Sequence, residues 1–92
     1  MPRLIRLYGV YVYMYKRSSY GKGNRDEHTN NPHIHLIYQG NEIRVNINDF
    51  SYEVLKGKLI PIMKDVAIEV IEEFKPQLLK MWKDQKFFKL DK

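Results

Sequence analysis

Residues 32–38 read Pro-His-Ile-His-Leu-Ile-Tyr, a run in which apolar and polar side chains largely alternate. Alternation with a period of two residues is typical of a β-strand that turns one face toward a core. Ile34 and Leu36 therefore belong to the core-facing side, and His33 and His35 share the opposite side. The pattern predicts a strand whose two histidines project away from the core and are open to contact.

The alternation continues on both sides of this strand. Two short sequences, Tyr8-Gly9 and Gln39-Gly40, interrupt it at positions that fit tight hairpin turns. The pattern predicts an antiparallel sheet of three to four strands. Two hairpins make up this sheet, at residues 3–16 and 32–48, and a short strand is expected separately at residues 54–59.

The segment between the two hairpins, residues 17–31, is rich in serine, glycine, asparagine and charged residues and has no periodicity. Such a composition offers little apolar surface to bury, and a loop of this length is uncommon inside a compact domain. We expect a mobile loop here.

The last third of the chain changes to a helical period. Apolar residues recur at steps of three and four from Met63 to Leu78, and Pro61 suits the first position of a helix. Pro76 predicts a kink or the start of a second helix. A helix, or a kinked helix pair, over residues 61–85 would cover one face of the sheet, with a short tail at 86–92. The predicted fold is therefore α+β, in one domain that spans residues 1–92.

Composition narrows the function classes. The chain has no cysteine, which excludes disulfides and thiolate zinc sites and favours a cytoplasmic location. No apolar run approaches about 18 residues, so we expect neither a membrane span nor a signal peptide. The net charge is +5, and residues 1–25 carry six basic residues and no acidic one. This segment fits nucleic acid or an acidic protein, although a simply solvated basic face has the same composition.

A single helix can cover only one face of the sheet, so the other face is the candidate binding surface. Tyrosine and arginine are favoured at protein interfaces, and rows of tyrosine can also stack on bases. Good strand propensity alone would account for the tyrosines as well. The candidate binding residues on this face are Tyr11, Tyr13, His33, His35, Arg44 and Asn46.

The histidines allow two kinds of chemistry. His33 and His35 could act as acid and base in a small ribonuclease, with Arg44 stabilising phosphate charge. Alternatively, His28 could join these two histidines in a metal site. A third interpretation makes them structural groups that tie the long loop to the sheet. No motif selects among these, so whether the chain is an enzyme stays open, and no cofactor is expected.

Several motifs together resemble a family of small bacterial and archaeal proteins called domain of unknown function 4160. These are Glu27-His28, the Pro-His-x-His start of residues 32–38, the run at 54–59 and the Leu-Leu-x-x-Trp close that ends at Trp82. The resemblance implies no chemistry, but it implies a genomic context. Members often sit beside a small protein of the domain of unknown function 2442 type, in pairs that resemble toxin–antitoxin modules.

We therefore expect a small basic interaction domain that forms one component of such a two-protein module. Its ligand would be the partner protein, with nucleic acid as a further candidate ligand of the same sheet face. The ribonuclease and the histidine metal site remain the alternatives, and the oligomeric state is not predicted.

Overall fold

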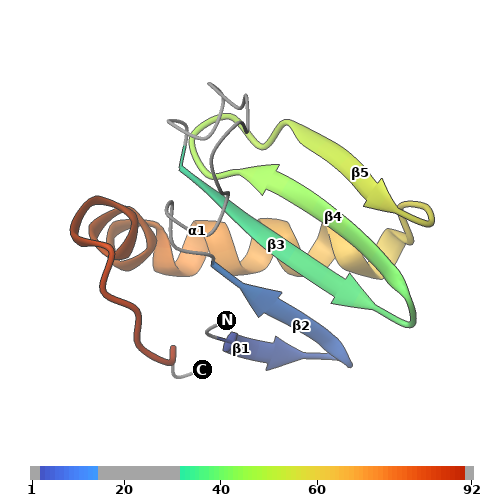
Figure 1. Cartoon of the computed structure of the whole chain (residues 1–92), viewed down its shortest axis with the longest axis horizontal. Helices are drawn as coiled ribbons and strands as arrows, with labels where there is room; N and C mark the ends of the chain where they lie inside the picture. The colour runs from blue at the N-terminus through green and yellow to red at the C-terminus, as the bar shows by residue number, and fades with distance from the viewer. Residues whose placement is uncertain (1–2, 15–31, 91–92) are drawn as a thin grey trace, which may run out of the picture.

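The computed structural model describes residues 3–14 and 32–90, which form a five-stranded antiparallel sheet and one helix (Figure 1). The strands follow one another in the sheet in chain order, from one edge to the other. The elements are β1 (Arg3–Leu7), β2 (Val10–Tyr13), β3 (His33–Tyr38), β4 (Asn41–Asn46), β5 (Tyr52–Lys56) and α1 (Pro61–Asp84). The α+β class is confirmed, with five strands where three to four were predicted. The two hairpins supply four strands and β5 adds the fifth. The segment predicted as a mobile loop, 17–31, lies outside the described residues.

Both predicted hairpin turns are present. Tyr8 and Gly9 have φ values of 52° and 82°, and Gln39 and Gly40 have φ values of 49° and 82°. Two consecutive residues with positive φ form a turn whose twist matches that of the flanking strands. Glycine in the second position adopts this conformation without a steric cost. These turns set the register of the sheet, and the register decides which side chains share a face.

Strand β5 begins two residues earlier than predicted and ends before Gly57. The Asp49 carboxylate accepts hydrogen bonds from the backbone N–H and the hydroxyl of Ser51, at 3.0 and 2.8 Å. This local turn is complete by residue 51, so Tyr52 can already pair with β4. Gly57 has a φ of 71°, a left-handed conformation that stops the strand.

The single helix lies across one face of the sheet (Figure 1). Its kink is at Phe74, where φ is −116° and ψ is 18°, two residues before Pro76. Proline lacks the N–H that an internal helical position needs, and its ring clashes with the preceding turn. The helix nevertheless continues to Asp84, so the kinked form of the prediction is confirmed. The predicted apolar stripe is buried: Met63, Val66, Ala67, Val70, Phe74 and Leu78.

The core lies between α1 and the sheet. Ile34 and Leu36 are buried, as predicted, and so are the other inward-facing apolar side chains of the first four strands and the residues that follow them: Val12, Met14, Ile43, Val45 and Ile47. Trp82 closes this core at the end of the helix. The tail also packs on it, because Leu90 is buried and its N–H donates to the Leu4 carbonyl at 2.8 Å. Within the described ranges, no helix is long and apolar enough to cross a membrane.

Candidate interaction face

The register of the sheet places the predicted residues on the face that α1 leaves uncovered, and three of them form one row across the strands. His35 is paired with Tyr13 on one side and with Arg44 on the other, and Arg44 is paired with Glu53 of β5. Residues paired directly across antiparallel strands project to the same face. The period-two assignment of faces is therefore correct.

The prediction that the two histidines are open to contact is wrong. His33 and His35 have only 1% and 4% of their surface exposed. Their ring centroids lie 5.3 Å apart, and the His33 ring lies 4.9 Å from the ring of Trp82. Alternation along a strand determines the face of the sheet to which a side chain projects, but not which other parts of the molecule pack against that side chain. Here an aromatic side chain from the last turns of α1 contacts the first residue of β3.

Glu42 holds His35 in one orientation. The Nδ1 atom of His35 lies 3.1 Å from Oε2 of Glu42. Burial, and secondly the nearby positive charge of Arg44, lower the pKa of His35 from 6.5 to about 4. The ring is therefore neutral at pH 7, with the proton on Nδ1, where it is donated to Glu42. This assignment leaves the lone pair on Nε2.

Sequence reasoning did not identify Glu42, although the hairpin contains the necessary signal. With Gln39-Gly40 as a two-residue turn, Glu42 pairs with Ile37, two positions from His35 on the same face. Diagonal neighbours of this kind are within reach of a glutamate side chain. Glu53, opposite Arg44, lies before the strand predicted at 54–59, so the same reasoning does not find it.

Arg44 and Asn46 have partners on β5 and the turn before it. The half-buried Arg44 guanidinium forms an ion pair with the exposed carboxylate of Glu53. Asn46 donates from Nδ2 to the hydroxyl of Ser51 at 2.7 Å. Asn46 therefore helps to hold the connection between β4 and β5, whereas Arg44 places a positive charge beside His35.

A basic and aromatic surface lies on this face at β1 and β2. The guanidinium carbons of Arg3 and Arg6 lie 5.2 and 5.3 Å from the centroid of the Tyr11 ring. The Tyr13 ring lies 6.5 Å from that of Tyr11. We call these four residues the Arg–Tyr patch. The sequence predicted its tyrosines, but not that both exposed arginines would stack on one ring.

The candidate metal site stays a prediction. Residues 3–14 and 32–90 contain no group of three histidine, cysteine, aspartate or glutamate side chains placed to hold a metal ion. His33 and His35 lie side by side, but the predicted third ligand, His28, lies outside the described residues.

The comparison with known families identifies the family of this chain. The family model DUF4160, described as a domain of unknown function, matches residues 9–83. The chain belongs to the DUF4160 family. The comparisons with curated proteins and with solved structures found no match. The DUF4160 match covers the sheet from β2 onward and nearly all of α1, including His33, His35, Glu42 and Arg44. It leaves out β1, which carries the two arginines of the Arg–Tyr patch.

Proposed function

We propose that this chain is a small basic interaction domain and one component of a toxin–antitoxin-like two-protein module. It binds an acidic surface of its partner protein through the uncovered face of the sheet. The observation that carries the proposal is the Arg–Tyr patch, where two exposed guanidinium groups stack on one tyrosine ring.

Stacking prepares these arginines for binding. A guanidinium that lies on an aromatic ring has lost part of its conformational freedom but keeps its N–H donors for a carboxylate. The three ion pairs among the described residues involve neither Arg3 nor Arg6. Arginine and tyrosine are also the residue types that contribute most to protein interfaces. The net charge of +5 would attract an acidic partner from a distance.

The test is binding to a small protein of the domain of unknown function 2442 type, the partner that the family resemblance implies. Calorimetric titration at two salt concentrations compares the wild type with an Arg3→Glu/Arg6→Glu variant. A matched control, Lys56→Glu/Lys58→Glu, makes the same change in net charge at the opposite edge of the sheet, where β5 ends. We expect a loss of about tenfold or more in affinity for the patch variant and a much smaller loss for the control.

Two results would overturn the proposal. One is the absence of any complex between the two proteins. The other is an equal loss in both variants, which would show non-specific attraction by net charge. A parallel titration with single-stranded RNA shows whether nucleic acid is the preferred ligand of the patch, which would also contradict the proposal.

A second candidate function, a small ribonuclease, is favoured by the pair of His35 and Glu42. A carboxylate that fixes the imidazole tautomer leaves Nε2 as a base, and His33 is close enough to act as its acid partner. Arg44 would stabilise developing phosphate charge. A pKa of about 4 makes His35 a weak base, and both rings are buried, so a substrate would require this face to open. Cleavage of labelled RNA by the wild type, and its loss in His35→Gln, is the test. An inactive wild type would contradict this function.

A further inference from the structure

The outer edge of the sheet at β5 is open and apolar. All five residues of β5 are exposed, and its first residue, Tyr52, has 52% of its surface exposed. Phe50, which lies just before the strand, has 39% of its surface exposed. β5 pairs with β4 on one side, and no strand among the described residues pairs with its other side. An edge strand of this kind presents unpaired backbone N–H and C=O groups to another strand.

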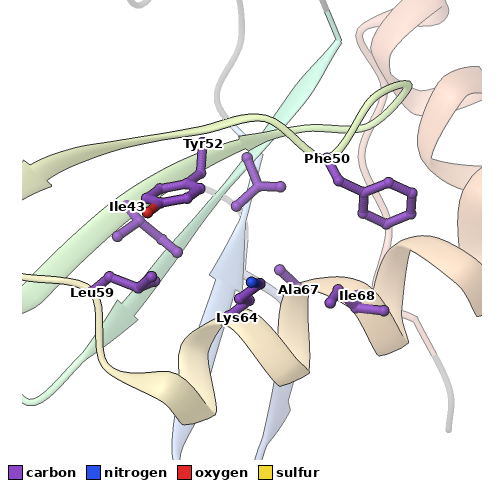
Figure 2. A pocket seen from close by; sticks show the side chains of 8 residues that line it. Ile43, Phe50, Tyr52, Leu59, Lys64, Ala67 and Ile68 are labelled. Atoms are coloured by element: carbon purple, nitrogen blue, oxygen red, sulfur yellow. The ribbon is translucent and has the colours of Figure 1, made fainter.

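An apolar hollow runs along this edge, between β5 and the first half of α1. Figure 2 shows Tyr52 and Phe50 above it, on the strand side, and Ile68 and Ala67 below it, on the helix. The cavity has a volume of about 40 Å³, far below the hundreds of Å³ of a small-molecule site. The feature is therefore suited to contact along its length rather than to enclosing a ligand.

The other edge of the sheet is protected. On β1, Arg3 and Arg6 are exposed and charged, and Leu90 of the tail donates a hydrogen bond to the carbonyl of Leu4. Charged side chains and a covering segment are the usual means by which edge strands avoid pairing with another chain. β5 also carries exposed charges, but among the described residues no segment covers it, and it exposes the apolar side chains of Tyr52, Val54 and Leu55. It is therefore the edge that is open to a partner.

The charges along the β5 edge identify the partner. Asp49 and Glu53 lie at the end where β5 begins, whereas Lys56 and Lys58 lie where it ends. Since Glu53 already forms an ion pair with Arg44, Asp49 contributes most of the acidic charge at the first end. A second β5 strand in antiparallel orientation places its basic end beside the acidic end of the first. A parallel orientation would place like charges together.

The helix does not add to this polarity. Because α1 runs antiparallel to β5 (Figure 2), Lys64 lies toward the end of the edge where β5 finishes, but the exposed Asp65 follows it directly. The self-complementary charges are therefore those of β5 and its two ends. Under a two-fold rotation this strand is complementary to itself, which is the requirement for an isologous dimer.

We propose that two copies of this chain associate through their β5 strands, antiparallel and about a two-fold axis, into one continuous sheet. The exposed apolar side chains of the edge bury against their counterparts in the other copy. A bulge in the pairing of β4 with β5, at Leu55, shortens the regular part of the edge, so we expect a reversible dimer of modest affinity. This inference concerns the edge opposite the Arg–Tyr patch and does not depend on the proposed function.

The experiment measures the mass of the purified full chain in solution by sedimentation equilibrium. At about 100 µM, where even a weak dimer is populated, we expect a mass near twice the 11.1 kDa of one chain. Val54→Lys puts a charge on the apolar edge and should yield a monomer. Lys56→Glu/Lys58→Glu should do the same, because acidic ends would then meet. Lys83→Glu/Lys86→Glu makes the same charge change away from the edge and should leave the dimer intact.

Several results would overturn the inference. A monomeric wild type at this concentration contradicts it directly. A dimer that persists in Val54→Lys must use another surface. Loss of the dimer in Val54→Lys but not in the Lys56→Glu/Lys58→Glu variant would contradict the antiparallel orientation. Far-UV circular dichroism of each variant shows that a monomer is folded, and the two edge variants test the same surface independently.

Discussion

The two faces of the sheet both contain buried side chains, but they bury them differently. The face under α1 is apolar, with residues such as Val12 and Leu36 completely inaccessible. The uncovered face buries His33 and His35 beside Glu42 and Arg44. Apolar side chains are stabilised by burial alone, whereas a buried polar group also needs a hydrogen-bond partner. Substitutions on the two faces should therefore differ in size and in their dependence on pH.

The largest effect is expected under the helix. Val70→Asp places a carboxylate at a completely buried position of α1. An unpaired buried charge costs several kcal/mol, against a total stability of roughly 5–10 kcal/mol for a domain of this size. We expect the variant to be largely unfolded by circular dichroism and urea titration. Gln77→Asp, at an exposed position of the same helix, should unfold almost as the wild type does. Equal stability of the two variants would show that this face is not a core.

The second largest effect is a loss of folding stability at acidic pH, which we expect from His35 on the uncovered face. Unfolded His35 takes up a proton below about pH 6.5, but the folded form, whose pKa is about 4, does not. The stabilisation is therefore complete above pH 6.5 and is lost as the pH falls toward 4, by up to roughly 3 kcal/mol. Urea titrations across this range should show a steeper decline for the wild type than for His35→Gln. Parallel curves would contradict the lowered pKa.

The comparison with His35→Gln is needed because Asp49 titrates in the same direction. Its hydrogen bonds from the backbone and hydroxyl of Ser51 lower the pKa of the carboxyl group. The stability that it contributes is present above its unfolded pKa and is lost in acid. Only the difference between the two proteins isolates the contribution of the imidazole.

A smaller effect is expected from His33→Ala. The substitution removes a buried ring that lies against Trp82 and His35, which we expect to lower stability by about 1–2 kcal/mol. A double-mutant cycle with Trp82→Leu should give a coupling energy of about 0.5–1.5 kcal/mol for the ring contact. Additive losses would show that the two rings do not stabilise each other.

The smallest effect on stability is expected at the Arg–Tyr patch. Arg6→Ala removes one exposed cation–π contact and should cost less than about 1 kcal/mol in thermal unfolding. The same change should weaken binding to the partner protein far more than it weakens the fold. Arg6→Lys keeps the charge but loses the planar group that stacks on Tyr11, so it separates charge from stacking. A large destabilisation by Arg6→Ala would make the patch part of the fold rather than a binding surface.

The sequence by itself determined the local structure and the assignment of faces. Period-two alternation separates Ile34 and Leu36 from His33 and His35, and the glycine-containing turns set the hairpin register. The helical stripe and the kink near Pro76 follow from spacing and from the missing proline N–H. These features depend on residues close together in the chain, so a single sequence is sufficient to predict them.

Only the tertiary structure decided the environment of those residues. Trp82 contacts His33 because the kinked helix brings together residues that are 49 positions apart in the chain, and Glu42 orients His35 through the pairing of two strands. The open β5 edge depends likewise on where α1 crosses the sheet. Burial, pKa and exposure are properties of neighbours in space, and the spacing of residues along one strand does not contain them.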